Sequence, residues 1–179
     1  GTKIVTVFPG NAARSLPAIA GLYVLMDGET GAPLVAMDGA RLTLWRTAAA
    51  SALASRAMAR ADASTMLMVG AGALAPFLVR AHASVRPLRR IMIWNRSPAG
   101  AQAVAADLRA QGFDAEAVPD LEAAARAADL ISCATLSRIA LIKGEWLAEG
   151  CHLDLVGAFS LSMREADDEA LARARVVVD

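Results

Sequence analysis

The chain has 179 residues, which is enough for one domain and part of another. Its 18 basic and 18 acidic residues balance, so the charge predicts neither a nucleic-acid partner nor a basic membrane-binding patch. Apolar residues make up 56% of the chain but never run to about 18 in succession, so we expect a packed core and no transmembrane helix.

Three short apolar runs near the start of the chain predict β-strands, at residues 3–8, 21–27 and 32–37. The second and third runs are separated by the turn signal Gly28-Glu29-Thr30-Gly31, which favours an antiparallel hairpin. Residues 1–42 are therefore expected to form a β-rich region. Ala and Leu then recur at helical spacing from Thr43 to Arg60, so residues 43–62 are predicted to be a helix connecting two domains.

Beyond this helix, apolar strand-like runs alternate with helical stretches, the pattern of βαβ units around a parallel sheet. The expected strands are residues 65–70, 90–95, 115–118, 130–134, 152–157 and 176–178, and the expected helices 73–84, 98–111 and 120–127. We predict an α/β fold in which residues 63–179 form a Rossmann-type parallel sheet with helices on both faces. The chain begins without Met and ends on a strand-like run, so we expect a piece of a longer protein.

The strand at 65–70 leads into Gly70-Ala71-Gly72-Ala73-Leu74-Ala75, which matches the GxGxxA pattern of dinucleotide-binding folds. Glycines let the backbone approach a pyrophosphate closely, and the following helix offers free N–H groups. We therefore predict nicotinamide cofactor contacts from Gly70, Gly72, Ala73 and Leu74. A purely structural tight turn is the alternative interpretation.

The end of the next strand indicates which nicotinamide cofactor is bound. NAD-binding folds usually place Asp or Glu there, whereas this chain has Asn95-Arg96-Ser97. Arg96 can pair with a 2′-phosphate, and Asn95 and Ser97 can donate hydrogen bonds. NADP(H) is therefore preferred and NAD(H) remains possible, while Arg96 as a solvated loop cation is the alternative.

Two further strand ends are expected to border the nicotinamide, because ligands bind beyond the carboxyl ends of parallel strands. They contribute Ala134 and Thr135 from one strand and Val156 and Gly157 from the other. Small residues there allow close approach of a ring, although they are also ordinary turn residues.

Two cations outside this fold are candidates for the substrate side. Lys3 begins the first predicted strand, and Arg46 lies near the start of the connecting helix. Taken alone, each cation is more often a solvated charge than a functional group.

Taken together, several ordered motifs make the chain similar to the ornithine cyclodeaminase/mu-crystallin family, and closest to its imine-reductase members. The motifs lie at residues 3–11, 38–39, 42–50, 70–72, 156–159 and 163–165. The resemblance implies that Lys3 and Arg46 are the catalytic pair that grips the substrate carboxylate, and that Thr47 contributes to the cofactor site. It also implies that residues 1–42 are part of a substrate and dimerisation domain, and that the full-length protein is a homodimer.

One departure from the family separates its activities. Members that cyclise ornithine carry an aspartate in the later glycine motif, where this chain has Phe159. Phenylalanine cannot handle the ammonium groups and protons of that reaction, but it can line a pocket against an apolar ring. The resemblance therefore implies NADPH-dependent reduction of a cyclic imino acid, Δ1-pyrroline-2-carboxylate or Δ1-piperideine-2-carboxylate, to proline or pipecolate.

Three other activities stay open: ornithine cyclodeamination, reductive amination of the alanine dehydrogenase kind, and non-catalytic binding of NADPH with a small ligand.

The remaining reactive side chains predict no further chemistry. Cys133 and Cys151 lie in apolar runs and are expected to be reduced core thiols of a cytoplasmic protein. His82 is expected at a helix end as a cap or surface residue. His152 beside Cys151 has neither the count nor the spacing of a zinc site, so no metal is expected.

Overall fold

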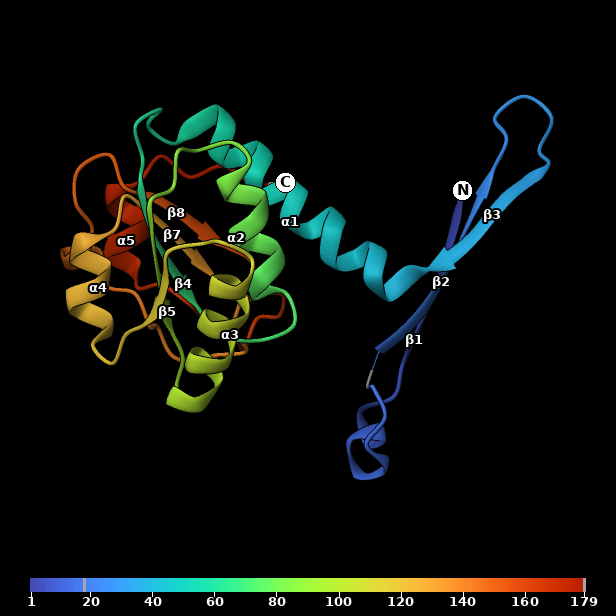
Figure 1. Cartoon of the computed structure of the whole chain (residues 1–179), viewed down its shortest axis with the longest axis horizontal. Coiled ribbons are helices and arrows are strands. Elements are labelled where there is room, and N and C mark those ends of the chain that lie inside the picture. Colours follow the sequence, from blue (N-terminus) through green and yellow to red (C-terminus); the bar gives the residue numbers. More distant parts are fainter. Residues whose placement is uncertain (18, 179) are drawn as a thin grey trace. The chain divides into compact units, whose positions relative to one another are not determined.

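The computed structural model describes residues 1–17 and 19–178 (Figure 1). It consists of two compact units, Gly1–Thr47 and Ala48–Asp179. The division falls inside the long helix α1 (Gly39–Met58).

The first unit contains a three-stranded antiparallel sheet in the order β1-β2-β3. Its strands are β1 (Thr2–Val7), β2 (Ile19–Met26) and β3 (Pro33–Asp38), and a 3₁₀ helix, η1 (Pro9–Arg14), follows β1. The predicted hairpin of β2 and β3 is confirmed, and β1 adds to the other edge of β2. Asp27 closes the hairpin turn by accepting hydrogen bonds from the backbone N–H groups of Glu29 and Thr30.

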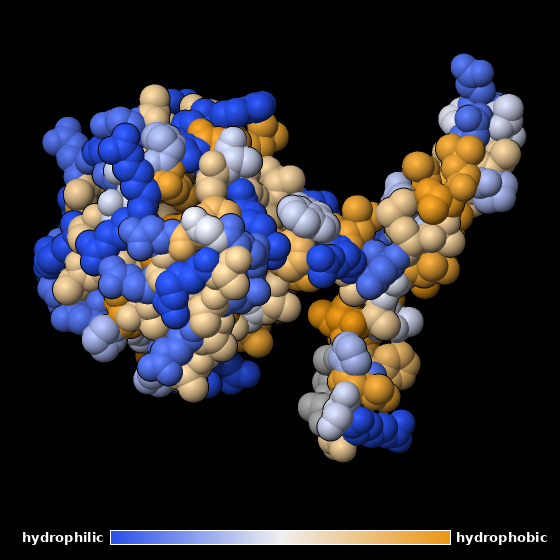
Figure 2. Space-filling view, viewed as in Figure 1, coloured by the Kyte–Doolittle hydropathy of each residue, from blue (hydrophilic) through white to orange (hydrophobic). Residues whose placement is uncertain are grey.

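Most side chains of this sheet are exposed despite their apolar character. On β1, Ile4 is 56% exposed and Val7 62%, and the other two strands contribute further exposed aliphatic side chains. Figure 2 shows these apolar residues gathered over the three strands. The sheet of the first unit therefore has no apolar core of its own within the described chain.

Helix α1 begins four residues before the predicted Thr43 because Asp38 caps it. Asp38 Oδ1 accepts hydrogen bonds from the backbone N–H groups of Ala40 at 2.8 Å and Arg41 at 3.0 Å. A short polar side chain directly before a helix satisfies N–H groups that have no partner within the helix.

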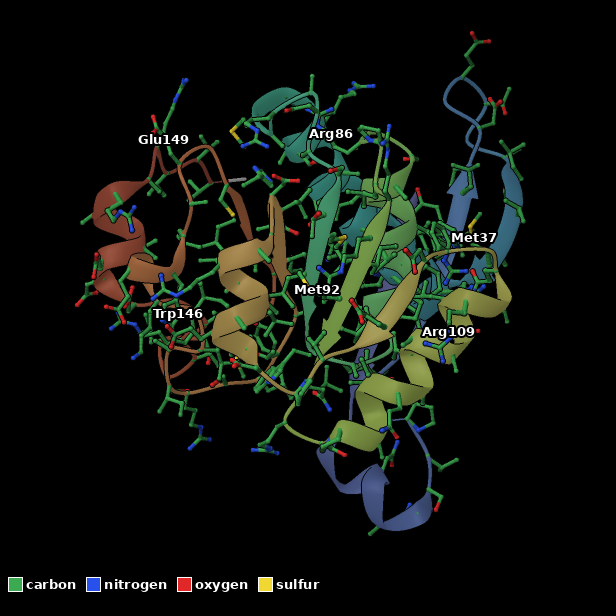
Figure 3. All side chains as sticks on the ribbon, turned by 60° about the vertical axis from the view of Figure 1, so that its left-hand side comes forward. Met37, Arg86, Met92, Arg109, Trp146 and Glu149 are labelled. Atoms are coloured by element: carbon green, nitrogen blue, oxygen red, sulfur yellow. The ribbon has the colours of Figure 1, made fainter. Side chains whose placement is uncertain are left out.

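The other end of α1 is closed by a side chain from a distant segment. The Arg86 guanidinium donates to the carbonyl oxygens of Ser55, Arg56 and Ala59 at 2.7 to 2.9 Å. Figure 3 labels this arginine. A cation therefore satisfies the last carbonyls of the helix, where the helix dipole favours positive charge.

The second unit is built on a five-stranded parallel sheet in the order β6-β5-β4-β7-β8. The strands are β4 (Thr65–Val69), β5 (Arg90–Trp94), β6 (Ala115–Ala117), β7 (Leu130–Cys133) and β8 (His152–Leu155). The helical elements are α2 (Ala75–Ala83), α3 (Pro98–Ala110), α4 (Leu121–Ala127), η2 (Gly144–Trp146) and α5 (Asp168–Arg173). Helices α2 and α3 cover one face of the sheet and α4 and α5 lie on the other (Figure 1), so the predicted Rossmann-type α/β fold is confirmed.

The core of this unit is formed by strands that are buried on both faces. One cluster joins the sheet to α4, α5 and η2, and its fully buried strand residues are Leu67, Val69, Ile131 and Cys133. Met92 lies on the sheet and Trp146 outside it (Figure 3), and both belong to this cluster. Strands shielded on both faces are built mostly of apolar residues, which explains their nearly continuous apolar runs.

Two predictions are wrong. Residues 176–178 do not form a strand; they are coil, with Val178 87% exposed, because no neighbouring strand accepts their backbone hydrogen bonds in the described part of the chain. His82 is no cap or surface residue, because its place in α2 faces the sheet and leaves it fully buried.

Candidate functional site

The glycine turn between β4 and α2 has a backbone that only glycine adopts without strain. Gly70 has a φ of +111°, and a Cβ there would lie 2.6 Å from the carbonyl oxygen of Ala134. Its N–H donates to the Trp94 carbonyl at 2.8 Å, which ties the turn to the end of β5. At Gly72, by contrast, a Cβ would meet nothing within 4 Å. Gly70 is therefore packed closely against the backbone of Ala134, whereas Gly72 borders open space.

The start of α2 has the features of an anion-binding helix terminus. Leu74, at the N-cap, makes no side-chain capping bond, and the first turn contains no acidic residue. Among the described contacts, none uses the backbone N–H of Ala71, Gly72, Ala73 or Leu74. Free N–H groups at the positive end of a helix dipole fit a pyrophosphate.

The end of β5 places three polar residues beside this turn. A Cβ on Gly100 would lie 2.9 Å from Asn95 Nδ2 and 3.5 Å from the Cβ of Ala71, so Asn95 borders the glycine turn. Arg96 is exposed, and no ion pair involving it is found in the described residues. Ser97 is the N-cap of α3 and makes no capping bond with its side chain. These groups fit a phosphate ester.

The carboxyl ends of β7 and β8 are joined by a buried carboxylate. Glu165 is 1% exposed, and its Oε1 accepts bonds from the Thr135 N–H at 2.6 Å and the Thr135 hydroxyl at 2.7 Å. Its Oε2 accepts a bond from the Gly157 N–H at 2.8 Å. The strand pairing continues past both strands. The Val156 N–H donates to the Cys133 carbonyl, and the Ala134 N–H donates to the Val69 carbonyl, each at 2.9 Å.

The structure thus brings all the predicted cofactor residues of the second unit to one edge of the sheet. They are Gly70, Gly72, Ala73, Leu74, Asn95, Arg96, Ser97, Ala134, Thr135, Val156 and Gly157. Phe159 follows on the loop after β8 and is 76% exposed. Parallel sheets of this kind bind ligands at this edge.

The two predicted substrate cations lie in the first unit, on the strand β1 and the helix α1. The Lys3 ammonium donates a hydrogen bond to the Thr43 hydroxyl, which in turn donates to the Gly39 carbonyl at 2.8 Å. Arg46 follows Thr43 by one helical turn, is exposed, and has no ion-pair partner among the described residues. Residues three apart share a helix face, so Lys3 and Arg46 flank the same side of α1. Thr47 is partly buried on the next position of α1.

A second carboxylate, Asp154 on β8, is partly buried and belongs to a network that its sequence context does not predict. It lies 2.7 Å from Ser132 Oγ, 3.1 Å from Ser51 Oγ and 3.3 Å from His82 Nε2. Burial would raise the pKa of Asp154, but the bonds from His82, Ser132 and Ser51 outweigh it and hold that pKa below its ordinary value. Burial lowers the pKa of the neighbouring His152, against the attraction of Asp154.

The two cysteines are thiols in surroundings that disfavour their charged form. Cys133 and Cys151 are both free. Burial raises the pKa of Cys151 to about 12 and that of Cys133 well above its ordinary value, so neither is a thiolate at neutral pH. The described residues contain no His, Cys, Asp and Glu cluster suited to a metal, and no helix among them is long and apolar enough to span a bilayer.

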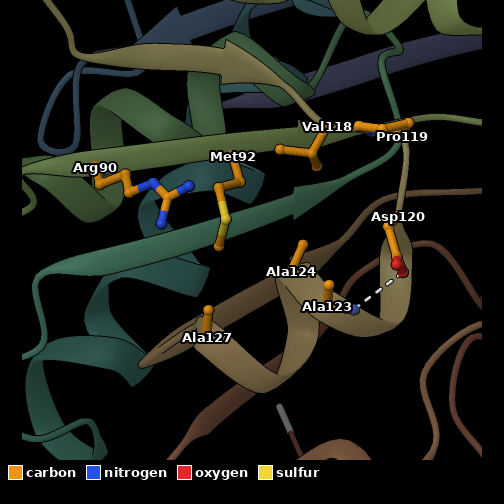
Figure 4. Close-up of a pocket in the computed structure, with 8 residues that line it drawn as sticks. All are labelled: Arg90, Met92, Val118, Pro119, Asp120, Ala123, Ala124 and Ala127. Atoms are coloured by element: carbon orange, nitrogen blue, oxygen red, sulfur yellow. Dashed lines mark hydrogen bonds between the residues drawn. The ribbon is translucent and has the colours of Figure 1, made fainter.

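A shallow hollow of about 260 Å³ lies between β5 and α4 (Figure 4). Its polar side chains are already engaged, because Arg90 pairs with Glu116 and Asp120 caps α4. The glycine turn does not line it. This hollow is therefore separate from the candidate cofactor site.

The profile of the ornithine cyclodeaminase/mu-crystallin family matches residues 1–179. The chain belongs to this family. The resemblance predicted from its motifs is therefore confirmed, and the positions above can be compared with family members.

Two curated members of the family match the whole chain. Protein SAR DEFICIENT 4 of Arabidopsis thaliana is 47% identical over 186 residues, which cover 100% of this chain and 57% of the relative. Delta(1)-pyrroline-2-carboxylate reductase of Paracoccus denitrificans is 43% identical over 180 residues, covering 100% of this chain and 57% of that enzyme. The chain thus spans little more than half the length of these relatives.

Among solved structures, Thermococcus litoralis Delta(1)-pyrroline-2-carboxylate reductase in complex with NADH and L-proline superposes with a TM-score of 0.86. The two are 31% identical, and the match covers 96% of this chain and 54% of the other.

Motif reasoning missed the roles of three residues. The Asp154 network and the Arg86 cap join segments far apart in the sequence, and neither has a local signature. Glu165 belongs to the motif at residues 163–165, but the motif alone does not predict its partners. Its position beside the ends of β7 and β8 depends on how the chain folds, and the sequence carries no local signal for it.

Proposed function

We propose that the whole protein is an NADPH-dependent imine reductase that converts a cyclic α-imino acid, Δ1-pyrroline-2-carboxylate or Δ1-piperideine-2-carboxylate, to proline or pipecolate. The observation that carries the proposal is a turn at Gly70 that fits a dinucleotide, together with two cations, Lys3 and Arg46, that have no ion-pair partner among the described residues, in a chain of this family. Similarity to pyrroline-carboxylate reductases at 43% identity supports the reaction class.

The residues of the second unit fit a nicotinamide dinucleotide. The turn from Gly70 to Leu74 would hold the pyrophosphate through backbone N–H groups. Thr135 and Gly157, with Ala134 and Val156, would border the nicotinamide. When bound, the reduced cofactor supplies the hydride that is added to the imine carbon.

Lys3 and Arg46 would hold the substrate by its carboxylate. Two cations bind and orient one fixed anionic group, which directs the C=N carbon of the imino acid. A protonated cyclic imine is already electrophilic, so it needs little acid–base help to become the amine. The Thr43 hydroxyl positions the Lys3 ammonium, and Lys3 is the group available to hold a proton near the imine nitrogen.

NADP(H) is proposed over NAD(H) because no carboxylate stands at the end of β5 to repel a 2′-phosphate. Arg96 is exposed there with no described ion pair. Replacing it by alanine (Arg96→Ala) should raise the KM for NADPH about 10-fold and leave that for NADH nearly unchanged. Equal changes for both cofactors would refute the preference.

The central test is turnover. The whole protein is incubated with NADPH and each cyclic imino acid, and loss of the reduced-cofactor absorbance is followed. No oxidation of NADPH with either imino acid overturns the proposed function. Lys3→Met should raise the KM for the imino acid about 100-fold, and Arg14→Met on η1 should leave it unchanged.

The other activities of the family give different results in the same assay. Ammonia released from ornithine would indicate a cyclodeaminase. That reaction needs a carboxylate at the position where this chain has Phe159. Consumption of ammonia with a 2-oxo acid would indicate reductive amination. Tight binding of NADPH and a small carboxylate without oxidation would indicate a mu-crystallin-like binding protein.

The assembly and location are also proposed. An exposed apolar sheet in the first unit supports a homodimer of the full-length protein, because such a surface is stable when covered. Two free thiols support a reducing, cytoplasmic location.

A further inference from the structure

Glu165 is a buried carboxylate without a cationic partner. It is 1% exposed, and no lysine or arginine in the described part of the chain lies within ion-pairing distance of it. Burying a charge is costly, and an apolar side chain would fill the same space at less cost. A carboxylate here therefore does something that an apolar residue cannot.

What it does is accept hydrogen bonds from two different loops at once. The N–H and hydroxyl of Thr135 bind one oxygen, and the N–H of Gly157 binds the other. Thr135 follows β7 and Gly157 follows β8. The backbone of Glu165 is itself held, because its carbonyl accepts bonds from Leu141 and Ile142 at 2.9 Å each.

The two loops are in close contact at this point. A Cβ on Gly157 would lie 2.1 Å from the carbonyl oxygen of Thr135 and 2.5 Å from Glu165 Oε1. The same two loops present exposed apolar side chains, namely Leu136, Ile139, Phe159 and Leu161. Glu165 therefore links the two loops that present this exposed apolar surface.

We propose that Glu165 is a positioning residue that fixes the loops after β7 and β8, against which the nicotinamide ring is held for hydride transfer. This inference rests on the proposed function. A shift of about 1 Å in such a surface is enough to slow a reaction about 100-fold.

The test is the substitution Glu165→Gln in the whole protein. The amide has nearly the same size, but its NH₂ group must replace one of the two carboxylate oxygens, so either the Thr135 N–H or the Gly157 N–H loses its acceptor. We expect kcat to fall about 20- to 100-fold and the KM for NADPH to rise about 5-fold. The primary deuterium isotope effect, measured with NADPH deuterated at the transferred position, should increase because hydride transfer becomes slower than product release.

Glu169→Gln is the matched control, because Glu169 lies on α5 with its side chain 53% exposed. It should leave kcat and the isotope effect unchanged. Urea unfolding of each variant establishes that the protein is folded at the assay temperature. If Glu165→Gln does not fold, Thr135→Val removes one of the three bonds and should give a smaller fall in kcat with the same increase in the isotope effect.

A folded Glu165→Gln variant with kcat within about 2-fold of wild type and an unchanged isotope effect overturns the inference. A lower unfolding midpoint with unchanged kinetics does the same, because it shows a purely structural role. If the wild-type protein does not reduce the imino acids, the proposed function fails by itself. The affinity for NADPH then still tests the positioning role of Glu165. An unchanged Kd for NADPH in Glu165→Gln overturns that role.

Discussion

The two units of this chain are both rich in apolar residues, yet only one of them buries these residues. In the second unit, Leu67 and Ile131 are fully buried between two layers of helices. In the first unit, Ile4 and Val7 of β1 are 56% and 62% exposed on a single-layer sheet. Apolar composition therefore does not make a core; a second layer that covers the apolar face does.

The same contrast applies to polar groups. The second unit contains a buried carboxylate, Glu165, and a partly buried one, Asp154, and each accepts three hydrogen bonds. In the first unit, Lys3 and Arg46 remain at the surface without ion pairs among the described residues. Buried polar groups are fixed by their partners, whereas surface cations remain available for a ligand.

The largest expected effect tests the contrast in apolar burial. Ile131→Ala should lower the free energy of unfolding by about 3 to 4 kcal/mol, because it opens a cavity in the core of the sheet. Ile4→Ala, at an exposed position, should change it by less than about 0.5 kcal/mol for the second unit. Urea unfolding measures both.

Sedimentation of the same Ile4→Ala variant should show weaker self-association, because it removes apolar surface from the exposed sheet. Equal losses of unfolding free energy in the two variants would contradict the comparison.

The glycine turn offers the next largest effect, with a matched pair of substitutions. Gly70→Ala should lower the unfolding free energy by about 2 to 3 kcal/mol, because its Cβ would meet Ala134 at a φ of +111°. Gly72→Ala should leave stability within about 0.5 kcal/mol, because the space there is open, but it should weaken NADPH binding by filling the approach to the pyrophosphate.

Urea unfolding and a fluorescence titration with NADPH separate the two outcomes. A Gly72→Ala protein that binds NADPH as tightly as wild type would remove this turn from the cofactor site.

A smaller effect concerns acid stability. The pKa of Asp154 is lowered in the folded protein, so its contribution is present above the unfolded pKa of about 3.9 and is lost as the pH falls through the folded pKa. Asp154→Asn should lower the unfolding free energy by about 2 kcal/mol at pH 7, and this difference should shrink toward pH 3. Unfolding curves at several pH values measure it.

The control for Asp154→Asn is Asp62→Asn, whose side chain is 81% exposed and pairs only with Arg60. It should change stability little at any pH. A constant difference between wild type and Asp154→Asn from pH 7 to pH 3 would contradict the role assigned to the carboxylate.

The sequence by itself determined the features that depend on neighbouring residues. Continuous apolar runs alternating with helical stretches gave the parallel α/β class, and the glycines at 70 and 72 marked the turn, because backbone conformation and burial on both faces leave local patterns. The Asn95-Arg96-Ser97 stretch was likewise readable from its position after a strand.

Only the tertiary structure decided which distant segments meet. It paired Asp154 with His82, 72 residues away, and joined Glu165 to Thr135 and Gly157. It also left residues 176–178 as coil, because their apolar character is local but the neighbour that a strand requires is not. Periodicity shows which face of an element is apolar, but the partner on that face is set by how the whole chain folds.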